Sequence, residues 1–143
     1  MKNKTTPAKQ DTATTKWYFL NAEGKILGRF ATEATKLLIG KNNPEFAPNA
    51  NMGSKVVITN AQKIVVTRKK LKDKKYIWYT GFPGGLRSRS LAEKMAKNPS
   101  KVIEAAISGM LPKNRLRRER LANLYVYNND QHPHTAQEKV LKK

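Results

Sequence analysis

An apolar run, a helical pattern and a second apolar run follow one another in residues 17–59, and this order limits the fold most strongly. Residues 17–20, Trp-Tyr-Phe-Leu, are typical of a buried strand. Residues 56–59, Val-Val-Ile-Thr, are typical of a strand covered on both faces. Between these runs, apolar residues recur at helical spacing before a C-cap at Gly40; they are Leu27, Phe30, Ala31, Ala34, Leu37 and Leu38. A strand, a helix and a strand in this order predict a βαβ unit with parallel strands and a right-handed crossover.

The rest of the chain continues the α/β pattern. The chain is predicted to turn at residues 60–63, before the apolar run at 64–66, and further strands are predicted at residues 76–79 and 124–127. Helices are predicted after Ser90, which forms a capping box with Glu93, and again from Pro99. The predicted fold class is therefore α/β: a single three-layer domain whose small, mostly parallel, four-stranded sheet is flanked by helices.

The domain is predicted to span residues 17–128. Residues 1–16 are rich in Lys, Thr and Gln and contain no apolar stretch, so we interpret them as a flexible basic N-terminal arm and not as a secretory signal. Residues 129–143 are polar and are predicted to form an irregular C-terminal tail. No apolar run approaches the roughly 20 residues that cross a bilayer, so no membrane-spanning segment is expected.

Positive charge dominates the composition, with 29 Lys and Arg residues against 10 Asp and Glu residues, a formal net charge of +19. A compact domain with this charge repels itself, so an anionic partner is expected. Nucleic acid is the first candidate, because each Lys or Arg placed on a phosphate releases condensed counterions. A membrane surface is the second candidate, but we predict no membrane partner. A cationic surface that serves solubility alone is the third.

No arrangement of residues indicates an active site. Gly24 and Gly28 match neither the G-x-G-x-x-G spacing of dinucleotide sites nor the spacing of phosphate loops. The chain has no Cys, which excludes disulfides, thiolate zinc sites and Cys nucleophiles. His132 and His134 are the only histidines, and they have too few neighbouring ligands for a catalytic zinc site. We therefore predict no catalytic residue, metal site, cofactor or small-molecule substrate, and keep a nucleotide-dependent enzyme as the third hypothesis.

Three basic clusters lie between the predicted elements, and we interpret them as RNA-binding surfaces. A guanidinium group can donate two parallel hydrogen bonds to the oxygens of one phosphate. The Arg-rich third cluster is therefore the strongest candidate. The alternative for any single cluster is a solvated face. The clusters are Arg68, Lys69, Lys70, Lys72, Lys74 and Lys75; Arg87, Arg89, Lys94, Lys97 and Lys101; and Lys113, Arg115, Arg117, Arg118 and Arg120.

Glycine, aromatic and histidine residues supply further candidate RNA contacts. Gly84 and Gly85 would let the backbone approach a sugar-phosphate chain, and the alternative is a simple tight turn. The aromatic residues at 76, 78 and 79 would stack on bases or pack in a core. His132 and His134 would hydrogen-bond to the backbone or to RNA.

Several short motifs occur in a characteristic order. They are Trp17-Tyr18, Gly24 to Arg29 (Gly-Lys-Ile-Leu-Gly-Arg), Gly40-Lys41, Asn60-Ala61, Thr80-Gly81, Pro83-Gly84-Gly85, Gly109 to Asn114 (Gly-Met-Leu-Pro-Lys-Asn) and His132-Pro133-His134. In these motifs the chain resembles the bacterial large-subunit ribosomal protein L-thirteen family, from about Trp17 to Gln137. The Gly-Met-Leu-Pro-Lys segment is the most specific of them.

The resemblance implies a small parallel-sheet domain that binds large-subunit ribosomal RNA, contacts neighbouring large-subunit proteins and acts early in subunit assembly. It implies a cytoplasmic location in the ribosome, without catalysis or a cofactor. Matched positions imply RNA contacts at Arg29, Lys41, Lys70, Lys113 and Arg118, and a close-approach loop at Gly84 and Gly85. The first hypothesis is thus a structural ribosomal protein. The second is a free RNA-binding regulator of messenger RNA translation that uses the same surface.

Overall fold

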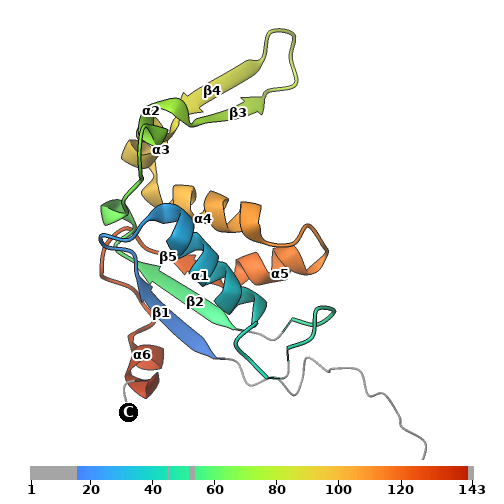
Figure 1. Ribbon diagram of the computed structural model, residues 1–143, viewed down its shortest axis with the longest axis vertical. Helices are drawn as coiled ribbons and strands as arrows, with labels where there is room; N and C mark the ends of the chain where they lie inside the picture. The colour runs from blue at the N-terminus through green and yellow to red at the C-terminus, as the bar shows by residue number, and fades with distance from the viewer. Residues whose placement is uncertain (1–15, 45, 52–53, 142–143) are drawn as a thin grey trace, which may run out of the picture.

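A three-stranded parallel sheet forms the centre of the molecule, built from β1 (Trp17–Asn21), β2 (Lys55–Thr59) and β5 (Leu124–Val126) (Figure 1). Strand β2 lies in the middle, with Val57 opposite Phe19 on one side and Tyr125 on the other. The computed structural model describes residues 16–44, 46–51 and 54–141. The arm predicted at residues 1–16 therefore lies outside the described residues, apart from Lys16. The predicted α/β class and its mostly parallel sheet are confirmed.

Helices α1 (Leu27–Ile39) and α4 (Pro99–Met110) lie together on one side of this sheet (Figure 1). Two right-handed crossovers that advance in the same direction across a sheet place their helices on the same side. Because side chains alternate along a strand, every second strand residue points toward these helices. The core on this side contains Phe30, Leu38, Val56, Ile58, Val102, Ile103 and Ile107, with Tyr18, Leu20, Leu124 and Val126 packed against it.

Local sequence signals set the ends of the helices. The Ser90 hydroxyl caps α3 (Leu91–Lys97) by accepting the Glu93 N–H at 3.3 Å, and it donates to the Glu93 carboxylate at 2.9 Å. Ser90 is thus the predicted N-cap, although the Glu93 carboxylate binds the Ser90 hydroxyl and not the Ser90 backbone N–H, as the full capping box would require. Pro99 occupies the first turn of α4, where its missing N–H costs nothing. The α1 helix ends at Gly40, as its position in the sequence predicted.

The C-terminal tail covers the other face of the sheet. The side chains that alternate with the core residues are Trp17, Phe19, Val57 and Tyr125, and the imidazole rings of the tail lie against three of them. Val57 is fully buried although it does not belong to the core on the helix side. The tail then forms helix α6 (Thr135–Leu141) beside β1. The prediction of an irregular tail is wrong, because α6 and the segment before it supply the third layer of the fold.

The apolar run at residues 64–66 does not join the sheet. After the 3₁₀ helix η2 (Ala61–Lys63), Val65 forms an isolated parallel bridge with Ile26. The Val65 N–H donates to the Lys25 carbonyl, and its carbonyl accepts the Leu27 N–H, each at 2.9 Å. These bonds fix the turn that leads into α1 instead of extending the sheet.

The predicted strand at residues 76–79 exists but belongs to a separate hairpin. Strand β3 (Lys75–Tyr79) pairs antiparallel with β4 (Leu86–Ser90), a strand that the sequence reading did not predict. The parallel sheet consequently has three strands among the described residues instead of the predicted four. Strand β4 was missed because its sequence, Leu-Arg-Ser-Arg-Ser, has little apolar character. Figure 1 shows this hairpin projecting away from the rest of the molecule.

Two short helices complete the described chain: α2 (Lys70–Asp73) precedes the hairpin, and α5 (Leu116–Ala122) precedes β5. In the described ranges, no helix combines the length and the apolar character needed to cross a membrane.

Candidate nucleic-acid interface

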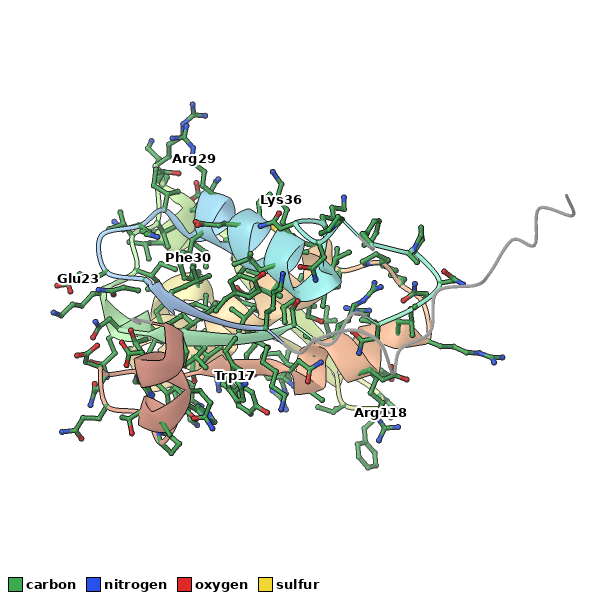
Figure 2. All side chains as sticks on the ribbon, turned by 90° about the horizontal axis from the view of Figure 1, so that it is seen from below. Trp17, Glu23, Arg29, Phe30, Lys36 and Arg118 are labelled. Atoms are coloured by element: carbon green, nitrogen blue, oxygen red, sulfur yellow. The ribbon has the colours of Figure 1, made fainter. Side chains whose placement is uncertain are left out.

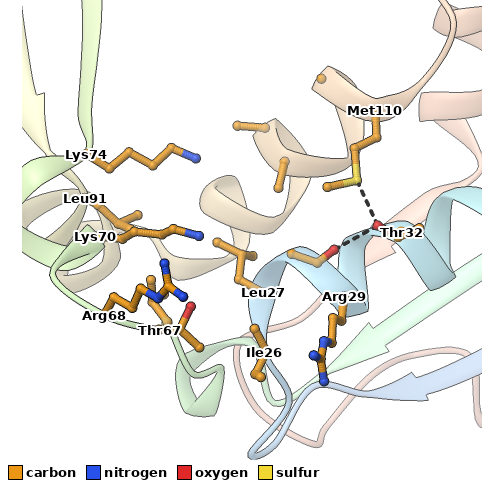
Figure 3. Close-up of a pocket in the computed structure, with 15 residues that line it drawn as sticks. Ile26, Leu27, Arg29, Thr32, Thr67, Arg68, Lys70, Lys74, Leu91 and Met110 are labelled. Carbon is orange, nitrogen blue, oxygen red and sulfur yellow. Dashed lines mark hydrogen bonds between the residues drawn. The ribbon is translucent and has the colours of Figure 1, made fainter.

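A cleft of about 760 Å³ opens between the start of α1, the end of α4 and the segment that leads into α2 (Figure 3). Leu27, Leu91 and Ala106 contribute apolar surface to it. At the α4 side, the Thr32 hydroxyl donates to the Gly28 carbonyl at 3.0 Å and approaches the Met110 sulfur at 3.6 Å. The cleft thus joins segments that are distant in the sequence.

Four cations line the cleft. Arg29 comes from the first turn of α1, while Arg68, Lys70 and Lys74 come from the segment around α2. No acidic side chain lines the cleft among the described residues. The ion pairs in that part of the chain involve other groups, such as Lys25 with Glu33 and Lys63 with Glu23. Figure 3 shows Lys70 and Lys74 extending into the cleft from the hairpin side. The cleft is therefore a concentrated positive surface.

The start of α1 adds a second source of positive potential. Ile26 at the N-cap supplies no side-chain acceptor, and the first turn has no acidic residue. The Leu27 N–H already donates to the Val65 carbonyl, so the N–H groups of Gly28 and Arg29, together with the helix dipole, favour an anion at this end. Apart from the adjoining backbone of α1, no atom lies within 4 Å of the position that a Cβ of Gly28 would occupy, so a ligand can approach the backbone there.

The backbone at Arg68 turns sharply beside the cleft. Its φ of 60° lies in the left-handed region, which residues other than Gly, Asn and Asp seldom adopt. Such conformations persist where surrounding structure holds them, and they often lie at functional sites. Arg68, Lys69 and Lys70 are all exposed in this segment.

The Arg-rich cluster at residues 113–120 has members that point into the fold and members that face solvent, because most of it lies on helix α5. Arg117 donates to the carbonyl and the hydroxyl oxygens of Ser108, at 2.7 and 2.8 Å. Arg120 is only 1% exposed, and its Nη2 donates to the Ala50 carbonyl at a long 3.4 Å. Burial lowers the pKa of the Arg120 guanidinium, which the charge of Glu119 partly offsets. Both arginine side chains therefore form hydrogen bonds within the fold.

The other members of that cluster face solvent. Lys113, Arg115 and Arg118 are exposed, and Figure 2 shows Arg118 pointing away from the body. Lys41 is also exposed, at the end of α1 opposite to Arg29 and about 20 Å from it, given a rise of roughly 1.5 Å per residue. The structure thus does not bring Lys41 into the cleft.

The β3–β4 hairpin carries its own cations. Trp78 lies opposite Arg87 in the antiparallel register, and the Arg89 guanidinium carbon lies 5.6 Å from the centre of the Trp78 ring. At the tip, Gly84 has a φ of 69° and open space where a Cβ would lie. A Cβ on Gly85 would instead collide with the Thr80 hydroxyl and lie 2.7 Å from the Phe82 carbonyl oxygen. Gly85 is thus required by the turn itself, while Gly84 leaves the backbone accessible.

The two histidines lie between the tail and the sheet. The His134 ring is 5.1 Å from the Trp17 ring and 4.7 Å from the Tyr125 ring, measured between centroids. Its Nε2 lies 3.1 Å from the Tyr127 hydroxyl. The His132 Nδ1 accepts the His134 N–H at 3.2 Å, and its Nε2 lies 3.5 Å from a Glu138 carboxylate oxygen. No group of three potential metal ligands occurs in the part of the chain that the structure describes. The histidines therefore fasten the tail.

We expect the protein to lose stability below about pH 6.5, the ordinary pKa of histidine. Burial lowers the pKa of His134 in the folded protein, and the charges of His132 and Lys55 act in the same direction. The unfolded chain then binds more protons, so the free energy of unfolding falls as the pH drops from 6.5 through the folded pKa. Thermal unfolding of the wild type and of His134→Gln at several pH values will test this. The variant should lose less melting temperature on acidification, and an equal loss would contradict the role of His134.

Sequence reasoning found the basic residues but not the way in which they are assembled. It did not predict that Arg29 lies in the same cleft as the segment around α2, because only the packing of the core brings these parts of the chain together. It also grouped Arg117 and Arg120 with exposed arginines. A signal was present, since Leu116 and Leu121 set a helical stripe on which Arg117 and Arg120 also lie.

Comparison with known proteins gives a consistent result. The family model described as Ribosomal protein L13 matches residues 15–133. The chain is 48% identical over 128 residues to the large ribosomal subunit protein uL13 of Pelotomaculum thermopropionicum, covering 90% of this chain and 89% of the relative. It is 47% identical over 135 residues to the protein of the same name from Legionella pneumophila, with 94% of each chain covered. A protein of that name from Rubrobacter xylanophilus is 47% identical over 122 residues, 85% of each chain.

Proposed function

The chain belongs to the ribosomal protein L13 family, and from this premise we propose that it is a structural constituent of the large ribosomal subunit that binds ribosomal RNA. Its relatives carry the name of a large-subunit protein and align over most of their length. The proposal places the protein in the ribosome, in the cytoplasm, with neighbouring large-subunit proteins as further partners. It gives the protein a supporting role from an early stage of subunit assembly and no catalytic step.

The cleft at the start of α1 is the observation that carries the RNA-binding part of this proposal. Its four cations have no acidic neighbour among the described lining residues, and they adjoin a helix N-terminus that has no side-chain cap. An RNA phosphate supplies the negative charge that this arrangement lacks. The apolar surface of Leu27 and Leu91 and the open space at Gly28 suit the close approach of a sugar-phosphate backbone. Contacts of this kind recognise the shape and charge of the RNA more than its sequence.

Further contacts are proposed from exposed cations outside the cleft. Lys113, Arg115 and Arg118 form one outward group, and Arg87 and Arg89 line the Trp78 face of the hairpin. Arg117, Arg120, His132 and His134 are left out of the proposed surface, because each is engaged within the fold.

The alternative is a free RNA-binding regulator of messenger RNA translation. The same cleft would serve it, but the family membership favours the ribosomal role.

Sedimentation separates the two functions. Lysate is fractionated on sucrose gradients at moderate and at high salt, and the chain is quantified by immunoblotting. We expect it to migrate with the large subunit at close to one copy per particle at moderate salt. A peak confined to the light fractions would overturn the ribosomal role and favour the free regulator.

A further inference from the structure

The β3–β4 hairpin presents two faces of opposite chemistry. Residues that pair across antiparallel strands share a face, and neighbours along a strand alternate between faces. One face therefore carries Tyr76, Trp78, Arg87 and Arg89, and we call it the cationic face. The other carries Ile77, Tyr79, Leu86 and Ser88, with Lys75 and Ser90 at its base, and we call it the apolar face. In these two strands, the arginines lie on one face only.

The apolar face is largely uncovered. Ile77 is 65% exposed, Tyr79 62% and Leu86 68%, and Phe82 at the adjoining tip is 73% exposed. A large aromatic side chain has roughly 150–250 Å² of surface, so these four residues expose on the order of 500 Å². The largest contiguous apolar patch on a typical monomer is about 300–600 Å² and often has a binding role, so this patch is a candidate binding surface. The hairpin also projects from the body, with α2 and α3 contacting β4 near its base (Figure 1).

RNA is a poor match for this face. The whole chain has 29 basic and 10 acidic residues, yet Lys75 at the base is the sole charged residue on the apolar face of these strands. Phosphates placed there would lose water without gaining a cation in return. The cationic face offers the reverse, with two arginines and a tryptophan that suit phosphates and bases. A single hairpin therefore separates RNA binding from a second kind of contact.

The area of the apolar face limits the class of partner that can bind there. A stable, independent protein interface buries about 800 Å² on each partner, more than this face offers. A contact of this size forms readily when both partners are already held side by side, because holding them in place removes most of the entropy cost of association. That condition favours a fixed neighbour in the particle over a freely diffusing dimer partner.

We infer that the apolar face of the β3–β4 hairpin docks against an apolar patch on a neighbouring protein of the large subunit, while the cationic face lies on RNA. This inference rests on the proposed ribosomal function and adds to it the surface that recognises a protein partner. Ile77, Tyr79 and Leu86 form the centre of the contact, and Phe82 extends it at the tip.

Site-specific photocrosslinking tests the assignment of the two faces. Benzoylphenylalanine replaces Tyr79 in one full-length protein and Trp78 in another, so adjacent residues report on opposite faces. Large subunits that contain each protein are purified, irradiated and treated with ribonuclease, and cross-linked peptides are identified by mass spectrometry. We expect the Tyr79 probe to label a peptide of another large-subunit protein and the Trp78 probe to label RNA.

The possible outcomes are distinct. Labelling of RNA, or of a second copy of this chain, by the Tyr79 probe would overturn the inference. Co-migration with large subunits without any protein cross-link from Tyr79 would overturn it as well, while leaving the ribosomal function intact. Absence of both probe proteins from large subunits, with the wild type also absent, would overturn the ribosomal function and this inference together.

A substitution gives an independent measurement. The double variant Ile77→Thr, Leu86→Thr keeps residues that favour strands but removes much of the apolar surface. We expect the variant to leave purified subunits at a lower lithium chloride concentration than the wild type, while its affinity for an isolated ribosomal RNA fragment is unchanged. Equal retention of variant and wild type would contradict the inference. A loss of affinity for the RNA fragment would assign this face to RNA.

Discussion

Replacing Arg29 and Lys70 by Gln will weaken binding to large-subunit ribosomal RNA by roughly 100-fold at about 0.1 M salt, because each lost phosphate contact costs about tenfold under these conditions. Both side chains line the cleft without an acidic neighbour among its described lining residues. The slope of log affinity against log salt concentration should shrink by about two, one for each contact. Fluorescence anisotropy with a labelled RNA fragment across a salt series measures both quantities.

A matched control removes the same amount of charge elsewhere. Lys25 and Lys63 already lie 3.9 and 2.7 Å from the carboxylates of Glu33 and Glu23. Their double replacement by Gln lowers the net charge by the same two units but leaves the cleft cations in place. We expect this control to keep most of the affinity and nearly the whole slope. Equal losses in both variants would mean that total charge, and not the cleft, determines binding.

The second large effect concerns the stability of the fold and the buried guanidinium of Arg120. Arg120→Ala should lower the free energy of unfolding by about 2–5 kcal/mol, because it leaves a cavity where a large side chain was fully buried. Arg120→Met fills most of that volume and also removes a charge whose pKa burial already depresses. Replacing a buried charge by an apolar residue of similar volume is often neutral. We therefore expect the Met variant to lie within about 1–2 kcal/mol of the wild type, the loss arising from the Ala50 carbonyl left without this donor.

Urea denaturation measures these differences, and Arg118 supplies the control on the same helix. Arg118 is exposed, so Arg118→Met should leave stability nearly unchanged while weakening RNA binding. Arg120→Met should lower the free energy of unfolding by at most about 1–2 kcal/mol and should leave RNA binding unchanged. If Arg120→Met weakened RNA binding as much as Arg118→Met does, Arg120 would have to reach the RNA after a rearrangement of α5.

The sequence alone was sufficient for the framework of the fold. The run at residues 17–20, the helical pattern from Leu27 to Leu38 and the run at residues 56–59 became β1, α1 and β2. In these segments the apolar residues recur with the period of the secondary structure. The elements can therefore be predicted without knowledge of any distant contact. The N-cap at Ser90 and the helix end at Gly40 are equally local. The ordered motifs, from Gly24–Arg29 to the histidine pair, likewise identified the family from the sequence alone.

Tertiary structure decided the features that depend on a distant partner. The aromatic residues of β3 are equally suited to a central strand, and only the turn at Gly84 and Gly85 returned the chain as β4 and made a separate hairpin. The polar tail formed a helix and a third layer, because Trp17, Phe19 and Tyr125 offered it an aromatic surface.

The candidate site shows the same division between local and distant information. The sequence identified Arg29, Lys70, Arg118 and Arg120 as cations, because charge belongs to the residue type. It did not determine which of them meet solvent, because exposure depends on how each helix is rotated against the core. Packing against Ala50 and Ser108 turned Arg120 and Arg117 inward, while the packing of α1 beside α4 placed Arg29 at the cleft. The amount of positive charge thus follows from the sequence alone, whereas the long-range contacts of the fold determine where that charge is available to RNA.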